Sequence, residues 1–240
     1  MTGAAVLVTL LSLAGPAFSQ DVSINFGQGA GLTERVIQLI ALITVLSLAP
    51  SILVMMTSFT RIVVVLSLLR TALGTGTAPP NAVIVALALF LTAFVMGPAF
   101  QNAYDAGIRP LLNNEITTEQ AFERSTGPFK TFMLKNVREK DLALFVDMSR
   151  EAKPATPEDV SLRILIPAFM ISELKRAFEI GFLLFLPFLI IDLVVASVLM
   201  SMGMMMLPPV VVSLPFKLIF FVLVDGWTLV AGSLIQSYGT

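Results

Sequence analysis

The chain alternates between long apolar stretches and one extended polar region. Four stretches reach the roughly 20 apolar residues that a helix needs to cross the hydrocarbon core of a bilayer. They are 36–56, 82–103, 164–200 and 210–235, and the third is longer than one crossing requires. The polar region, 104–162, separates the second stretch from the third. This pattern predicts an all-α membrane protein with four hydrophobic helical segments and a helical insertion outside the membrane.

Local signals predict that the polar region is helical. Thr117 and Gln120 have the spacing of a capping box, and the sequence T-P-E-D at 156–159 is typical of a helix N-terminus. Apolar side chains recur at helical spacing around Phe129–Met133 and Leu142–Val146. A region of about sixty residues buries only a modest core by itself. Its aromatic residues therefore either form that core or face another subunit.

Prolines occur at seven positions within and beside the apolar stretches. Each removes a backbone donor, and a freed carbonyl inside hydrocarbon is costly unless protein or water satisfies it. We therefore expect helices that are broken, re-entrant, or packed against protein more than lipid. The prolines are Pro50, Pro98, Pro167, Pro187, Pro208, Pro209 and Pro215.

Residues 1–19 have the pattern of a cleaved signal peptide. An apolar run, 4–13, is followed by Gly15–Pro16, and small residues at Ala17 and Ser19 precede a cleavage point. No lysine or arginine precedes the apolar run. The alternative is a further transmembrane helix, for which the segment is too short.

A mature N-terminus outside the cytoplasm leads to a topology in three parts. Residues 20–103 form an N-terminal segment with two hydrophobic spans, 104–162 a helical periplasmic region, and 163–240 a C-terminal hydrophobic hairpin with a Met-rich turn. The loop between the first two spans then lies inside. It carries Arg61 and Arg70 and no acid, in agreement with the positive-inside rule.

The composition narrows the possible functions. The chain is 56% hydrophobic and 13% charged, with a mean hydropathy of +0.90, whereas soluble domains are about 25% charged. A net charge of −1 gives no indication of nucleic-acid binding. The absence of cysteine and histidine excludes disulfides, thiol and imidazole chemistry and most transition-metal sites. We expect no cofactor.

Two charged residues stand alone in apolar stretches, Asp192 in F-L-I-I-D-L-V-V and Lys217 in L-P-F-K-L-I-F-F. A charge at the centre of a spanning helix costs about 2.5–3.5 kcal/mol, so such residues are usually paired or functional. Antiparallel helices joined between them would bring both to a similar depth. The simplest interpretation is a salt bridge, within one subunit or between two. A proton or ion relay and the lining of a polar path are the alternatives.

Four further charges fall within a span of seven residues, 173–179. Glu173 with Arg176, and Lys175 with Glu179, have spacings that allow pairing along a helix. These charges cannot all face lipid. The segment therefore lies above the membrane or packs in a polar seam between subunits.

Methionine occupies five of the seven positions 200–206, immediately before Leu207–Pro208–Pro209. Methionine is unbranched and polarizable, so it adapts to irregular gaps. Copies of Met204, Met205 and Met206 that met around an axis would form an apolar collar, able to block ions yet deform around a passing chain. The alternative is that these residues only fill helix ends in lipid.

No set of residues assembles into a catalytic pattern. Ser172 and Lys175 match S-x-x-K, but no second element of a serine acyl-transfer site accompanies them. Asp192 and Asp225 could suggest the two aspartates of an intramembrane protease. Asp225, however, lies in V-D-G-W, which favours a position at the membrane interface. The glycines of 74–76 lack the downstream Gly-Lys-Ser/Thr of a phosphate loop. We expect that the chain is not an enzyme.

From Arg163 to Ser237 the chain resembles the FliP/SctR family of type III export-gate membrane proteins. The signal peptide and four hydrophobic stretches fit the whole chain, whereas the N-terminal third and 104–162 resemble the family more loosely. The matching runs are R-I-L-I-P-A-F, S-E-L-K-R-A-F-E-I-G-F, P-F-L-I-I-D-L-V-V-A-S-V-L-M-S-M-G-M-M-M-L-P-P and L-P-F-K-L-I-F-F-V-L-V-D-G-W.

The resemblance implies a channel-forming subunit of the flagellar type III export gate, passing unfolded flagellar proteins across the inner membrane. It implies about five copies that assemble with FliQ-like and FliR-like subunits into a helical conical channel in the flagellar basal body, in contact with other export-apparatus proteins and membrane lipid. It also implies a methionine gasket, buried channel charges and contacts for subunit assembly. The gasket would be formed by Met204, Met205 and Met206, and the channel charges would be Asp192 and Lys217. The assembly contacts would be Phe132, Phe145 and Glu173.

The alternative function is a small ion-coupled secondary transporter that uses Asp192 and Lys217 near the membrane midplane. That interpretation predicts internal repeats, and the sequence contains none. An intramembrane hydrolase using Ser172 and Lys175 is a more distant alternative. If Asp192 and Lys217 only pair, exchanging them should restore assembly better than either single neutralisation.

Overall fold

The computed structural model describes residues 54–149, 154–204 and 206–239, with isolated positions between 36 and 52. The chain divides into two units, 1–47 and 48–240, and the helices α3 to α10 belong to the second. The predicted signal peptide and most of the first apolar stretch lie outside the described residues. Every element within the described ranges is helical, in agreement with the predicted all-α class.

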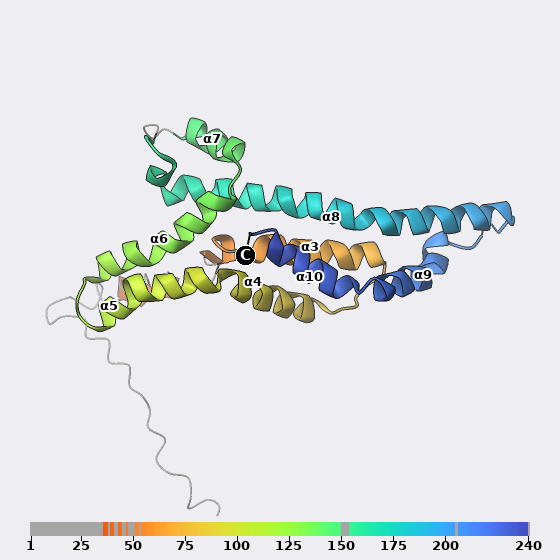
Figure 1. Ribbon diagram of the computed structural model, residues 1–240, viewed down its shortest axis with the longest axis horizontal. Helices are drawn as coiled ribbons and strands as arrows, with labels where there is room; N and C mark the ends of the chain where they lie inside the picture. Colours follow the sequence, from red (N-terminus) through yellow and green to blue (C-terminus); the bar gives the residue numbers. More distant parts are fainter. Residues whose placement is uncertain are drawn as a thin grey trace, which may run out of the picture. The chain divides into compact units, whose positions relative to one another are not determined.

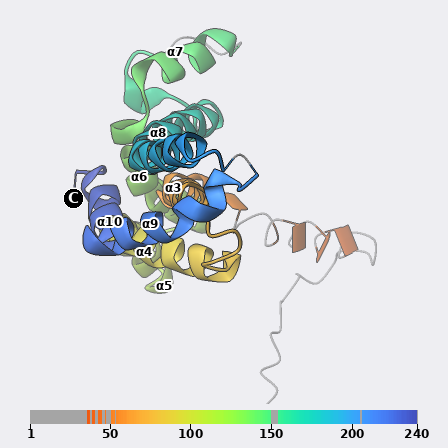
Figure 2. The same ribbon diagram turned by 90° about the vertical axis from the view of Figure 1, so that its right-hand side faces the viewer.

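Helix α3 (Phe59–Leu73) is the central element of this unit. It lies between α8 (Leu162–Ser201) and α4 (Asn81–Ala103) in both views (Figure 1, Figure 2). Its buried apolar residues, among them Ile62, Leu66 and Leu69, form the main core with neighbouring helices. The helix ends at Gly74, whose φ of 75° lies in the left-handed region that glycine adopts without a Cβ penalty.

Two described helical stretches are long and apolar enough to cross a membrane. One is Asn81–Leu112, in which α4 continues through a π-helical turn, η1 (Tyr104–Ile108), into α5 (Arg109–Leu112). The other is α8, which has 40 residues. A third is obtained if α9 (Pro209–Leu223) and α10 (Gly226–Gln236), which meet at 62°, count as one broken span. The structure thus supports two or three of the four predicted segments.

The expected interruptions at proline are absent at four of the seven positions. Helix α4 runs through Pro98, α8 through Pro167 and Pro187, and α9 through Pro215. At Pro98 one reason is local, because the preceding residue is a glycine without a Cβ to clash with the proline ring. The two neighbouring prolines that begin α9 occupy its cap and first turn, where no backbone donor is needed.

The break between α9 and α10 lies where no proline stands. Asp225 adopts a left-handed conformation with φ 49° and ψ 52°. The next residue, Gly226, is packed so tightly that an added Cβ would collide with the ring of Phe221. A close backbone approach therefore makes this bend.

The polar region is helical, as predicted. It contains α6 (Thr118–Asn136), α7 (Glu139–Met148) and a short 3-10 turn, η2 (Pro157–Asp159). The capping box at Thr117 and Gln120 is present, with both reciprocal hydrogen bonds at 3.3 Å. A second core joins α6 to α4 and α8 and includes Met133 and Phe169. Phe129, buried against Phe100, belongs to this internal core.

Candidate functional site: two buried ion pairs and a methionine turn

Asp192 of α8 and Lys217 of α9 form an ion pair within one chain. Lys217 Nζ donates to Asp192 Oδ2 at 2.7 Å, and the side chains are 5% and 29% exposed. The hydroxyl of Ser213 donates to the other carboxylate oxygen at 2.5 Å. Both oxygens of the acid are thus occupied by groups on α9, which couples the two arms of the α8–α9 hairpin.

Lys217 also bonds to the C-terminal end of α3. Its Nζ donates to the carbonyl oxygen of Ala72 at 3.3 Å, in the last turn of that helix. The final carbonyls of a helix carry partial negative charge and favour a cation. Lys217 on α9 therefore connects to two further helices at one point. One acceptor is a carboxylate on α8, and the other is a backbone carbonyl on α3. The sequence contained no signal for this second contact.

The methionine turn forms the end of the α8–α9 hairpin (Figure 1). Gly203 turns the chain with a φ of 71°. Met204 is 41% exposed and Met206 is 98% exposed, whereas Met205 lies outside the described residues. Neither described methionine of the predicted seal is buried within its own chain.

Glu173 forms a second buried ion pair, with Arg61 of α3. Arg61 Nε donates to Oε2 at 2.9 Å and Nη2 to Oε1 at 2.5 Å, and the two side chains are almost fully buried. The possible pairing of Glu173 with Arg176 is therefore replaced by a long-range pair. The possible pairing of Lys175 with Glu179 does occur, at 3.4 Å on an exposed surface.

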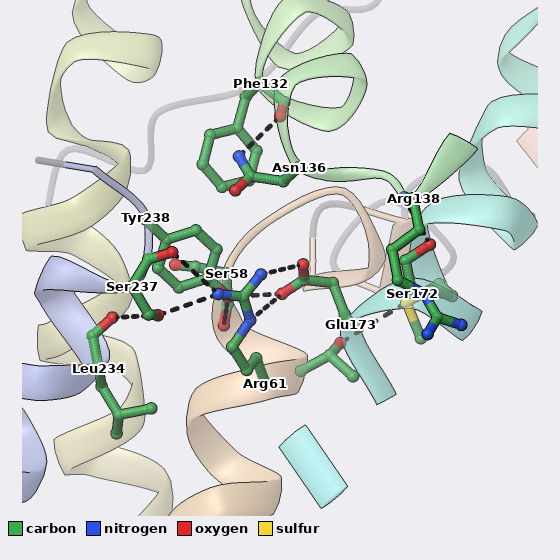
Figure 3. A network of polar contacts seen from close by, with 12 residues as sticks. Ser58, Arg61, Phe132, Asn136, Arg138, Ser172, Glu173, Leu234, Ser237 and Tyr238 are labelled. Atoms are coloured by element: carbon green, nitrogen blue, oxygen red, sulfur yellow. Dashed lines mark hydrogen bonds and ion pairs between the residues drawn. The ribbon is translucent and has the colours of Figure 1, made fainter. Parts of the chain in front are cut away.

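Arg61 and Tyr238 are the residues that the sequence analysis missed at this pair (Figure 3). Arg61 was assigned to an inside loop, but it lies buried in α3. It is a lone charge in an apolar run, T-R-I-V-V-V, which is the same signal that singled out Asp192. Tyr238 had no such signal, since tyrosine near a chain end is unremarkable in sequence.

Tyr238 contacts both members of the Arg61–Glu173 pair. Its hydroxyl donates to Glu173 Oε2 at 2.5 Å, and the Arg61 guanidinium lies 3.8 Å from the ring centroid. Phe132 of α6 stacks on the other side of the tyrosine, with centroids 5.7 Å apart. Phe132 also meets Phe169 edge-on at 6.0 Å. Two of the three predicted assembly residues, Phe132 and Glu173, thus share one neighbour.

Phe145, the third predicted assembly residue, lies on α7 and is partly buried against the second core. Helix α7 is attached to α8 through Asp141, which accepts a hydrogen bond from Ser172 at 2.7 Å. The Arg138 guanidinium donates two hydrogen bonds to the same carboxylate and holds the pKa of Asp141 below its usual range.

Ser172 and Lys175 do not form the serine–lysine arrangement of a hydrolase. The hydroxyl of Ser172 is fully buried and bonded to Asp141. Lys175 is exposed and paired with Glu179. Each residue of the S-x-x-K match therefore has a separate structural partner.

Comparisons with known proteins identify the family of this chain. The FliP family matches the chain over residues 42–234. The flagellar biosynthetic protein FliP of Caulobacter vibrioides is 65% identical over 235 residues, covering 98% of this chain and 88% of that protein. The protein of the same name from Bacillus subtilis is 55% identical over 202 residues, covering 84% and 91%. That from Aquifex aeolicus is 51% identical over 234 residues, covering 97% and 98%.

Identity of this extent leaves little of the chain outside the comparison, and every candidate residue described above lies within it or within four residues of the end of the family match. The resemblance noted from the C-terminal motifs is thereby confirmed. The chain therefore belongs to the FliP family, whose members compared here are flagellar biosynthetic proteins.

Proposed function

We propose that this chain is a channel-forming subunit of the flagellar type III protein export gate, and that Met204, Met205 and Met206 form its constriction. About five copies would surround an axis, together with FliQ-like and FliR-like membrane subunits and other export-apparatus proteins. The assembly would sit in the inner membrane at the flagellar basal body, with 104–162 on the periplasmic side. Unfolded flagellar proteins would pass through it.

The observation that carries this proposal is the exposed methionine turn at the end of a braced hairpin. Met206 is 98% exposed in the single chain, although methionine is an apolar residue that packs readily. The hairpin behind it is held by the Asp192–Lys217 pair. An exposed turn at the end of a hairpin whose two arms are paired behind it is suited to meeting equivalent turns of other copies around an axis.

The apolar surface of α8 supports an assembly with further protein subunits. A continuous helix of 40 residues is about 60 Å long, twice the roughly 30 Å of the hydrocarbon core. Large apolar side chains are exposed from Ile171 to Met200, among them Phe182 and Leu193. Lipid alone cannot cover apolar side chains along that length. Other subunits would cover the remainder.

The subunit interpretation is tested by the native mass of the complex after gentle detergent extraction, with FliQ-like and FliR-like subunits co-expressed. We expect a stable assembly with about five copies of this chain and the small hydrophobic partners. A folded monomer or dimer without partners would instead support the ion-coupled transporter. The geometry disfavours that alternative, because both Asp192 oxygens already accept bonds from Lys217 and Ser213.

Replacing Met204, Met205 and Met206 together with alanine is expected to make the membrane leak ions while protein export largely continues. Alanine removes the flexible side chains that would close the constriction but leaves the backbone turn. Membrane conductance and secretion of flagellar proteins are the two measurements. The matched control replaces Met200 and Met202, which are 59% and 66% exposed on the preceding helix end. Unchanged conductance in the triple variant would remove the seal from the proposal.

A further inference from the structure

The segment that follows α10 is built into the interior. Tyr238 is only 3% exposed and belongs to the main core. Ser237, just before it, accepts hydrogen bonds from Arg61 Nη1 through its hydroxyl at 2.9 Å and its carbonyl at 3.4 Å. A buried guanidinium and a buried carboxylate thus both bind the segment that follows α10.

Helix α10 follows the bend at Asp225, packs on α9 and α4, and contributes Val230 and Leu234 to the main core. Between α10 and α8 lies a pocket of about 200 Å³, lined by Ile180 and Leu184 on one side and Leu229 and Val230 on the other. Ser237, which also lines this pocket, and Tyr238 follow the end of α10 and join it to Arg61 of α3 and Glu173 of α8. These polar contacts add to the apolar packing that places α10 relative to α3 and α8.

The ion pair and the chain end also depend on each other. Arg61 directs Nε and Nη2 to Glu173 and Nη1 to Ser237, so the chain end supplies acceptors that the carboxylate cannot (Figure 3). Glu173 accepts from both Arg61 and Tyr238. Removing a partner from a buried charged network leaves its remaining members unsatisfied. The pair is therefore complete only when the last residues of the chain are in place.

We propose that Ser237 and Tyr238 form a C-terminal latch, closed on Arg61 and Glu173, which fixes α10 on the core, and that Phe132 and Glu173 act on subunit assembly as positioning residues of this latch. The second half of the proposal rests on the proposed function, whereas the latch is a property of the single chain. Phe132 stacks on the latch tyrosine and Glu173 binds its hydroxyl, so replacing either would release α10.

The latch has a spectroscopic signature. Burial, together with the neighbouring Glu173 carboxylate, raises the pKa of the Tyr238 phenol well above its ordinary value. The chain has two tyrosines, and Tyr104→Phe leaves Tyr238 as the sole one. Absorbance at the tyrosinate band then follows this single phenol. We expect it to remain protonated at about one pH unit above the ordinary tyrosine pKa of about 10, where an exposed phenol is about 90% ionised.

In that background, Phe132→Ala and Glu173→Ala are expected to let Tyr238 ionise in the ordinary range and to lose the high-mass assembly together. Tyr238→Ala should lose assembly as well, while Tyr238→Phe, which keeps the ring between Phe132 and Arg61, should retain most of it. The controls are Phe122→Ala on the exposed face of α6 and Glu179→Ala on the exposed face of α8. Both should leave ionisation and assembly unchanged, and circular dichroism checks the fold of every variant.

Three results would overturn the proposal. Ordinary ionisation of Tyr238 in the Tyr104→Phe chain would mean that the latch is open. Lost assembly in Phe132→Ala or Glu173→Ala with Tyr238 still protonated would make these residues direct subunit contacts. If Tyr238→Ala still formed the full complex, the latch would have no role in subunit assembly. A protonated Tyr238 in a chain that never forms a large complex would instead uphold the latch and reject the proposed function.

Discussion

Replacing Lys217 with methionine is expected to be the most disruptive single substitution in the hairpin. Methionine keeps the length of the side chain but leaves Asp192 without its cation and the Ala72 carbonyl without its donor. Removing one partner of a fully buried ion pair costs about 3–5 kcal/mol, and because Asp192 is 29% exposed we expect a loss near the lower end of that range. Thermal unfolding of the detergent-solubilised chain and the amount of assembled complex are the measurements. Lys175→Met breaks an exposed pair and is the control, with an expected loss of at most about 1 kcal/mol.

Exchanging the two charges is expected not to restore the native complex. The exchange keeps the two opposite charges at positions 192 and 217, so it should restore assembly better than either single neutralisation if the two residues only pair. In the structure Lys217 also donates to the Ala72 carbonyl. An aspartate at position 217 is too short to reach that carbonyl and supplies no donor for it, and it adds a negative charge on the side of the negative end of α3. Recovery of assembly to the level of the unchanged chain would mean that pairing is the only role of these residues.

Gly107→Ala is expected to be the second large effect, and it acts through packing alone. Gly107 lies in the π-helical turn after α4, buried against α6. A Cβ there would meet the Ser125 hydroxyl and would lie 2.6 Å from the carbonyl oxygen of Ala121 and 2.9 Å from the backbone nitrogen of Ser125. Backbone atoms cannot rotate away, so we expect a loss of about 3 kcal/mol, the upper end for overpacking.

The matched control for this prediction is Gly232→Ala in α10. Among the described residues, no atom outside the neighbouring backbone of α10 itself lies within 4 Å of a Cβ at this position. Alanine in a helix interior is more favourable than glycine by roughly 0.5–1 kcal/mol. Thermal unfolding should therefore shift in opposite directions for the two variants. Equal melting temperatures for Gly107→Ala and the unchanged chain would show that η1 and α6 are not packed as described.

Local sequence patterns predicted the features that depend on one helix alone, such as its cap and its extent. The capping box at Thr117 and Gln120 depends on residues three positions apart, and it is present. The second and third apolar stretches correspond to α4 and α8. Helix continuity through Pro167 and Pro187 was not predictable in this way. A proline weakens a helix locally, but packing over its whole length determines whether the helix continues.

The partners of the charged residues could be predicted from the sequence for one ion pair but not for the other. Asp192 and Lys217 lie on the two arms of one hairpin, so their similar depth followed from the sequence of apolar stretches. Glu173 had a plausible partner at i+3 but pairs with Arg61, 112 residues away. An i,i+3 pair on a helix surface contributes only a few tenths of a kcal/mol. In the core, Arg61 donates a hydrogen bond to each carboxylate oxygen of Glu173. The burial of Glu173 therefore decides that it pairs with Arg61 and not with Arg176.

By itself, the sequence determined that this is an apolar helical membrane protein with a methionine turn between two charged arms, because length, hydropathy and local spacing are properties of contiguous residues. Only the tertiary structure decided that α3 is a central buried helix, that Lys217 binds its C-terminal carbonyl, and that Tyr238 completes the Arg61–Glu173 pair. These contacts join residues more than sixty positions apart. Their formation depends on how whole helices pack, and no local pattern encodes that.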